Sequence, residues 1–265
     1  MSRVVLIVAL TVGLPAYGKL EIRTIQPCHG ALGAERTSDD VFPHDEYVVR
    51  YQLAGVKTDK DGKTDLEVAV LLKNAEGKAV VDRKTPVQRV LSLGGDTMQT
   101  AGSITFPEKA PPGVYTLSVV VRDRISSETA SFERKLTCKP TEFQVLSPRF
   151  FRDEEMKIPA GATMHVGEVL YYRLLVAGFD RSQKKIGLLM RSTFLDADGK
   201  DIGAKTVVMT GGESDPEKAA KSTLATFKGS GVLHRAGNYK LRIAIEDTVA
   251  KKTLTMEAVI KVVAP

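Results

Sequence analysis

The sequence predicts an all-β protein built from two similar units, and three observations support this class. Apolar and polar residues alternate along much of the chain, as they do in half-buried strands. One such stretch, "GVYTLSVVVRD" at residues 113–123, recurs as "GNYKLRIAIED" at residues 237–247. Val, Ile, Thr and Tyr are frequent in these runs, and glycine-containing turns separate them. We therefore expect antiparallel strands that pack as two sheets in each unit.

The repeat extends well beyond these two strands. "YVVRYQLAGV" at residues 47–56 matches "LYYRLLVAGF" at residues 170–179, an offset of 123 (170 minus 47). "NAEGK" at residues 74–78 matches "DADGK" at residues 196–200, an offset of 122 (196 minus 74), and both read as hairpin turns with glycine at a positive φ. A nearly constant offset indicates duplication of a unit of about 120 residues, which is long enough to hold its own core.

The boundary between the two units is predicted near Pro140, in a short proline-containing linker. The first domain then covers residues 19–140 and the second covers residues 141–265. Seven or so short strands in each unit, separated by turns, predict a β-sandwich.

The repeated strand shows the expected alternation clearly. Tyr115, Leu117, Val119 and Val121 share one face, while the residues between them face away. One short helix is predicted at residues 215–224, as an insertion in a loop of the second unit. The other predicted strands cover residues 47–53, 65–72, 103–106, 130–138, 187–195, 223–227 and 253–263.

The N-terminal segment, residues 1–18, has the layout of a secretory signal peptide. Arg3 precedes an apolar run from Val4 to Leu14, and Ala16 and Gly18 are small residues in a cleavage-site pattern. The run is shorter than the roughly 20 residues that a spanning helix needs, and the alternative is a buried core helix. We therefore expect an exported protein, periplasmic or extracellular, with no membrane span.

"PPGVYTL" and "RAGNYKL" resemble the tyrosine corner of immunoglobulin-like domains. The resemblance implies a structural role for Tyr115 and Tyr239, whose hydroxyls would bond to the backbone of the preceding turn. Leu117 and Leu241 stand where antibody domains have a cysteine, and the chain has no Trp. The resemblance is therefore to tandem bacterial immunoglobulin-like domains of secreted and cell-surface proteins.

The chain has two cysteines, Cys28 and Cys138. An exported protein meets an oxidising compartment, where disulfides persist. The immunoglobulin resemblance places these residues near the ends of the first and last strands of the first domain, which are neighbours in such sandwiches. A structural disulfide is the favoured expectation, and free buried thiols or a metal site are the alternatives.

The formal net charge is +6 at pH 7, but the basic residues are scattered and no nucleic-acid-reading motif is present. The loop from Asp59 to Asp65 lacks the glycine and the final carboxylate of an EF-hand, which leaves calcium binding open. No convergent set of residues predicts a catalytic, cofactor or metal site, and the histidines lack metal-ligand spacing. The four histidines are His29, His44, His165 and His234.

These patterns predict a non-catalytic exported binding or structural protein. Its partner would be a protein or polysaccharide of the cell envelope, bound through loops or edge strands. The long loops at residues 28–44 and 148–167 are the expected contact surfaces. The alternatives are a periplasmic two-domain chaperone of the pilus-assembly kind and a carbohydrate-binding accessory protein of an enzyme system.

Overall fold

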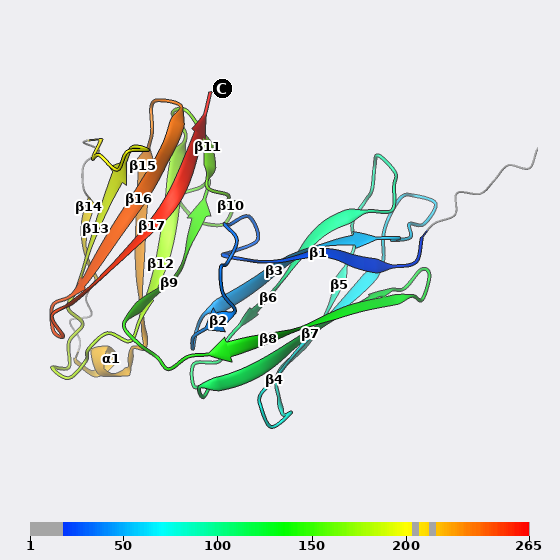
Figure 1. Cartoon of the computed structure of the whole chain (residues 1–265), viewed down its shortest axis with the longest axis horizontal. Coiled ribbons are helices and arrows are strands. Elements are labelled where there is room, and N and C mark those ends of the chain that lie inside the picture. The colour runs from blue at the N-terminus through cyan, green and yellow to red at the C-terminus, as the bar shows by residue number, and fades with distance from the viewer. Residues whose placement is uncertain (1–17, 203–206, 212–215, 265) are drawn as a thin grey trace, which may run out of the picture.

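The computed structural model describes residues 18–202, 207–211 and 216–264, and the predicted signal peptide lies almost wholly outside them. The structure is nearly all β, with 56% strand and 3% helix arranged in several antiparallel sheets (Figure 1). No helix in the described residues is long and apolar enough to cross a membrane. The all-β class is therefore confirmed.

Residues 18–140, called the first half below, form two sheets. The order is β1-β3-β6 in one sheet and β2-β8-β7-β4-β5 in the other. The strands are β1 (Glu21–Cys28), β2 (Asp40–Val41), β3 (Glu46–Ala54), β4 (Leu66–Lys73), β5 (Ala79–Val87), β6 (Met98–Thr105), β7 (Gly113–Asp123) and β8 (Thr129–Cys138).

Residues 141–264, called the second half, also form two sheets. The order is β10-β9-β12-β15 in one and β11-β17-β16-β13-β14 in the other. The elements are β9 (Gln144–Phe151), β10 (Pro159–Ala160), β11 (Thr163–His165), β12 (Val169–Ala177), β13 (Leu188–Leu195), β14 (Val207–Gly211), α1 (Pro216–Lys221), β15 (Leu224–Val232), β16 (Gly237–Asp247) and β17 (Lys252–Val263).

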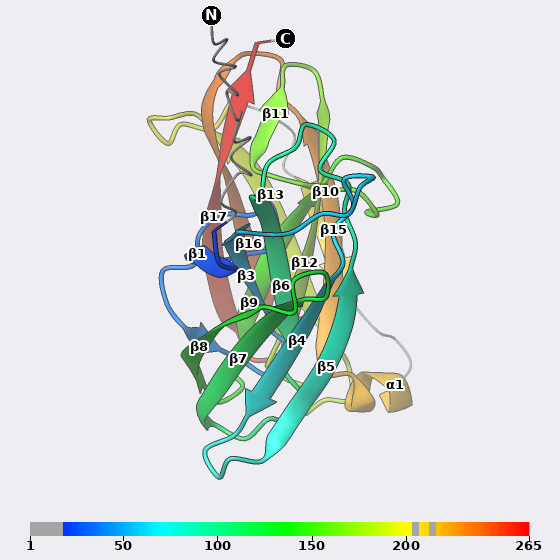
Figure 2. The same cartoon turned by 90° about the vertical axis from the view of Figure 1, so that its right-hand side faces the viewer.

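Each half has its own apolar core between its two sheets. In β7 the residues of one face, Tyr115, Leu117, Val119 and Val121, are buried in the first core. In β16 the matching face places Leu241, among others, in the second core. Figure 1 shows the two halves as separate β structures joined end to end near β8 and β9, and Figure 2 shows the first half in front of the second.

The two halves repeat the same local contacts. The hydroxyl of Tyr115 donates a hydrogen bond to the carbonyl of Pro111 at 2.9 Å, and that of Tyr239 donates to the carbonyl of Arg235 at 3.0 Å. Both bonds reach back to the turn before the strand. These are the contacts that the tyrosine-corner resemblance implies.

A glycine follows β3 in the first half and β12 in the second, and each packs against the backbone at the start of its half. Gly55 and Gly178 have φ values of 75° and 68°, which favour glycine. A Cβ at Gly178 would overlap the backbone carbonyl of Glu142, and one at Gly55 would meet that of Lys19. The strand ends therefore fit only when position 178, and equally position 55, has no side chain.

Most predicted strands are present, and two of them, β7 and β16, have the predicted bounds. The predicted helix forms over Pro216–Lys221. No strand was predicted at β5, because most of its residues are exposed and their apolar spacing gives no alternation. Strand β6 begins earlier than predicted and β15 ends later, where small or polar residues continue the pairing.

The predicted disulfide is wrong: Cys28 and Cys138 are both buried and unbonded. The reason is a register shift in β1 between Arg23 and Gln26, close to Thr24, whose φ is 51°. One extra residue in a strand moves every following side chain to the other face. Cys28 therefore lies opposite Val48, on the face that turns away from the core, whereas Cys138 belongs to the core.

Candidate functional site

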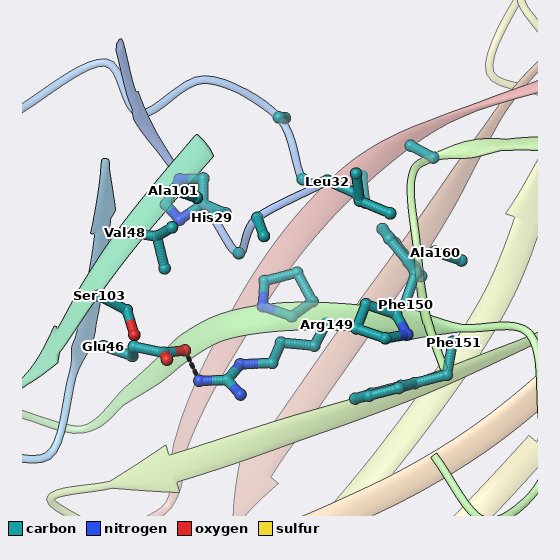
Figure 3. A pocket seen from close by; sticks show the side chains of 18 of the residues that line it. His29, Leu32, Glu46, Val48, Ala101, Ser103, Arg149, Phe150, Phe151 and Ala160 are labelled. Atoms are coloured by element: carbon teal, nitrogen blue, oxygen red, sulfur yellow. Dashed lines mark ion pairs between the residues drawn. The ribbon is translucent and has the colours of Figure 1, made fainter. Parts of the chain in front are cut away.

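An apolar groove of about 570 Å³ lies between the two halves. A volume of this size suits a small ligand or a short segment of chain. The first half contributes the loop at residues 29–34, two residues of β3 and part of β6. The second half contributes β9, β10, Ala162 and residues 256–259 of β17. Figure 3 shows this groove, with His29 and Val48 on one side and Phe150, Phe151 and Ala160 on the other.

In the second half, the groove runs between the edges of the two sheets, where β9 and β17 lie. β9 is paired with β12 along its length, but on its other side only with β10, at Phe150 and Phe151. β17 is paired with β16, and on its other side with β11 only at residues 261–263. The chain crosses from one sheet to the other between β10 and β11, and beyond this crossing the sandwich is open. We call this opening, marked by Ala162 and Ala258, the second-half seam.

The equivalent seam of the first half is closed by polar side chains. Arg134 on β8 lies opposite Leu117, as Ala258 on β17 lies opposite Leu241. The backbone carbonyl of Asp39 accepts a hydrogen bond from Thr137, as the carbonyl of Ala162 accepts one from Lys261. These matching pairings make Asp39 equivalent to Ala162 and Arg134 equivalent to Ala258.

In the first half these two side chains meet. The Nε of Arg134 donates to Oδ1 of Asp39 at 2.8 Å, and the hydroxyl of Tyr47 donates to the same oxygen at 2.5 Å. Burial raises the pKa of Asp39, but the bonds from Arg134 and Tyr47 outweigh it and hold the pKa below its usual value. Two alanines replace this ion pair in the second half, and the groove occupies the space that they leave open.

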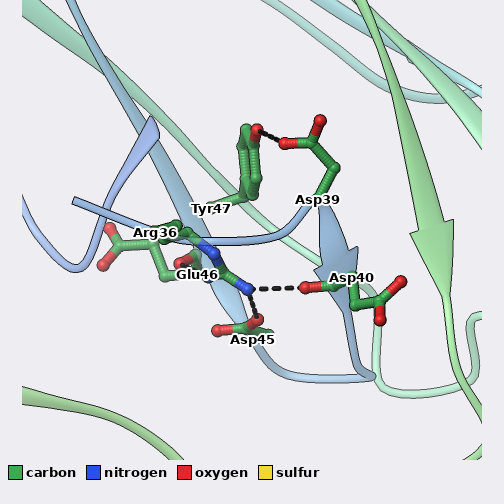
Figure 4. Close-up of polar contacts among 6 residues, drawn as sticks. All are labelled: Arg36, Asp39, Asp40, Asp45, Glu46 and Tyr47. Carbon is green, nitrogen blue, oxygen red and sulfur yellow. Dashed lines mark hydrogen bonds and ion pairs between the residues drawn. The ribbon is translucent and has the colours of Figure 1, made fainter. Parts of the chain in front are cut away.

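The loop that forms the opposite wall is fixed by a buried ion pair (Figure 4). The guanidinium of Arg36 donates to Oδ2 of Asp45 at 2.9 Å and to the carbonyl of Asp40 at 2.6 Å. It also lies over the ring of Tyr47, with 5.1 Å between its central carbon and the ring centroid. The side chains of Arg36 and Asp45 are only 6% and 4% exposed. Burial raises the pKa of Asp45, and the charge of Arg36 opposes that rise.

One ion pair joins the two halves across the groove. Glu46 on β3 binds Arg149 on β9, and Figure 3 shows the two side chains pointing toward each other. Burial lowers the pKa of Arg149, and the nearby charge of Arg173 lowers it further. Arg173 itself lies over the ring of Phe151. This pair links β3 to β9 and places one negative and one positive side chain among the lining residues of the groove, to which Glu257 of β17 adds a further negative charge.

His29 lies at the foot of the loop and lines the groove. Burial, and then the charge of Arg36, lower its pKa from 6.5 to about 4. The imidazole is therefore neutral at pH 7 and remains neutral in mildly acidic solution. A neutral ring adds one polar group, with a donor and an acceptor nitrogen, to an otherwise apolar wall.

The residues singled out in the sequence are placed in several regions. Tyr115 and Tyr239 support turns, and Cys28 lies behind the groove wall next to Val48. In the loop from Asp59 to Asp65, Oδ1 of Asp59 accepts hydrogen bonds from the backbone of its own turn. The described residues contain no group of three or more His, Cys, Asp or Glu side chains arranged to hold a metal ion.

Both segments expected to form a contact surface line the groove, the first through residues 29–34 and the second through residues 148–151, 159, 160 and 162. The second segment is not a continuous loop, because its lining residues belong to β9 and β10 except for Ala162. Two residues of the groove, Glu46 and Ala258, carried no signal as a site in the sequence, and Arg149 and Ala162 were included only as part of the expected contact surface at residues 148–167. A position-by-position comparison of the two repeats shows the loss of Arg134 and Asp39 in the second copy. The pairing of Glu46 with Arg149 has no such local signal.

Comparison with known proteins finds no match by sequence: no family model matches the chain, and no curated protein is significantly similar to it. The function is therefore inferred from the geometry of the groove and from the fold.

Proposed function

We propose that this chain is a non-catalytic exported binding protein, built from two tandem immunoglobulin-like domains over residues 19–140 and 141–265. The strand order supports the immunoglobulin-like assignment, because β1-β3-β6 faces β8-β7-β4 in the first half and β9-β12-β15 faces β17-β16-β13 in the second. The bonds of Tyr115 and Tyr239 to the preceding turns support it further. Export rests on the signal-peptide pattern of residues 1–18.

The observation that carries the binding role is the groove between the halves. It is largely apolar, it is lined by the loop at residues 29–34 and by β9 and β10, and it opens where Ala162 and Ala258 replace an ion pair. A preformed apolar hollow with a few polar groups is the usual form of a binding site. Glu46, Arg149, Glu257 and His29 are among those polar groups. The partner is expected in the cell envelope or outside the cell.

The carbohydrate-binding alternative gains no support from the described surface. The large hydrophobic side chains that are exposed there are all Ile, Leu or Val. Sugar binding of the accessory kind uses exposed aromatic rings, because their faces stack on the sugar. A largely apolar groove favours an apolar or peptide-like partner instead.

The test is photo-crosslinking from the rim of the groove in the producing cells. A p-benzoylphenylalanine at Val259, which is 64% exposed, would capture whatever occupies the groove. The control position is Val120, an exposed residue of β7 that does not line the groove. A discrete adduct from position 259 that is missing from position 120 is the expected result.

A sealed variant makes this test specific. The double substitution Ala162→Asp and Ala258→Arg rebuilds in the second half the pair that Asp39 and Arg134 form in the first. The expected result is loss of the adduct from position 259. An adduct that persists in the sealed variant, or no adduct at all, would refute the groove as the binding site.

A further inference from the structure

We propose that the groove binds an extended peptide segment that pairs with the open edge of β17 and places alternate apolar side chains into the second-half seam. This inference rests on the proposed binding function and specifies its partner. Three features carry it: the unpaired strand edge, the apolar interior beside it, and the polar groups at its outer side.

The edge of β17 is the first feature. The N–H of Lys261 donates to the carbonyl of Ala162, so odd-numbered residues of β17 direct their backbone groups toward the β11 side. Pairing with β11 ends at Lys261. In the described chain no strand continues this pairing past Val259 and Glu257, and both residues line the groove. A bound strand would extend the pairing that β11 begins, in continuity with it.

The interior of the seam is the second feature. Met256 and Ala258 point toward the second core but remain partly exposed, because the sheets do not close over them. Val145 on β9 and Ala162 form the opposite side. Since side chains of a strand alternate between two faces, every second residue of a peptide on β17 would enter this apolar space. The site therefore selects apolar residues at alternate positions.

The outer side of the same edge is polar. Glu257 is exposed and pairs with Arg242 at 2.8 Å and with Lys240 at 3.7 Å. The remaining side chains of a bound peptide would lie beside Val259 and this charged cluster, and the expected outward residues are polar. The pattern of the partner is thus alternately apolar and polar, as in a half-buried strand.

The first half provides an internal comparison. Its equivalent strand, β8, also has an open edge before its pairing with β2 at Thr137 and Cys138. There the seam is filled by Arg134 and Asp39, so a bound strand would have no space for its apolar side chains. The structure therefore restricts strand binding to the second half.

The experiment selects binders from a library of random linear twelve-residue peptides displayed on phage. The purified protein is the bait, and the sealed variant (Ala162→Asp with Ala258→Arg) is the counter-selection. We expect enriched peptides with apolar residues at every second position. The best of them, labelled with fluorescein, is then titrated by fluorescence anisotropy.

Two changes test the backbone pairing. Val259→Pro removes the N–H that faces the open edge and leaves the bonds to β16 in place, so peptide affinity should fall at least tenfold. The sealed variant should abolish binding. N-methylation of alternate amides in the peptide should weaken binding by a similar factor, and it requires no change in the protein. Urea unfolding of the Val259→Pro variant checks that it remains folded.

The outcomes separate this inference from the proposed function. Equal affinity of the protein for the unmethylated and the N-methylated peptide would overturn strand pairing. The crosslinking test could give adducts at position 259 that the sealed variant loses, while the phage selection yields no peptide. This outcome would support the binding role and exclude a peptide partner. A concentration-dependent dimer in light scattering that Val259→Pro abolishes would identify a second copy of the chain as the occupant and overturn the proposal.

Discussion

Removal of Arg36 is expected to destabilise the first half strongly, because its positive charge is buried against the negative charge of Asp45. Their side chains are 6% and 4% exposed, and the N–O distance is 2.9 Å. Breaking a pair that is buried to this degree leaves one charge uncompensated and costs about 3–5 kcal/mol. Arg36→Met keeps an unbranched apolar stem but removes the guanidinium group, and with it the charge and the hydrogen bond to the carbonyl of Asp40.

The loss should depend on pH. Without Arg36, burial holds the pKa of Asp45 above its unfolded value. The folded state then binds a proton more readily than the unfolded state, so its stability rises as pH falls through the folded-state pKa. Arg36→Met should therefore lose less stability at pH 5 than at pH 7. The double variant with Asp45→Asn removes the uncompensated charge and should be more stable than Arg36→Met at pH 7.

The assay is urea unfolding followed by circular dichroism, since the chain has no Trp to report by fluorescence. Wild type, both single variants and the double variant form a cycle that gives the coupling between the two side chains. If Arg36→Met lowers the free energy of unfolding by less than about 1 kcal/mol at pH 7, and by the same amount at pH 5, the argument from burial is refuted. Peptide binding should also weaken in Arg36→Met, because this residue fixes the loop at residues 29–34.

Three further predictions concern other parts of the chain. Cys28 and Cys138 should react with a thiol reagent only in denaturant and should show two thiols per chain, because both are buried and unbonded; a single disulfide in the mass of the native protein would contradict this. The imidazole pKa of His29 falls from 6.5 to about 4 on folding. The free energy of unfolding of the wild type should therefore fall by about 1–2 kcal/mol as the pH drops through this window, after allowance for solvent screening. In His29→Gln the free energy of unfolding should change less over the same pH range. Gly178→Ala should cost about 2–4 kcal/mol through backbone overlap at positive φ, whereas Gly199→Ala, with open space around its Cα, should cost about 1 kcal/mol; equal losses in thermal unfolding would contradict the overlap.

Local patterns were sufficient to predict the all-β class and most of its strands. The alternation in β7 and β16 predicts which face is buried, and the structure buries that face. The turn glycines Gly77 and Gly199 have the expected positive φ, at 79° and 83°. These features depend on neighbours within a few residues, so a single sequence is informative about them.

The groove was predictable only in part. The loops at residues 28–44 and 148–167 are long, and length alone drew attention to them as contact surfaces. That both loops line one cavity depends on how the two halves meet, through Glu46 and Arg149. These residues are far apart in the chain, and each alone is an ordinary charged residue on a strand.

The sequence by itself determined that the chain is β-rich and that one pattern occurs in it twice, because strand alternation and turn chemistry are local properties. Only the tertiary structure decided what the differences between the repeats mean. One extra residue near Thr24 turns Cys28 away from the core, because the faces of a strand alternate with a period of two. The change from Arg134 to Ala258 opens a groove only because Asp39 is replaced at the same time by Ala162 across the seam. Such pairings join distant segments, and packing rather than local preference selects them.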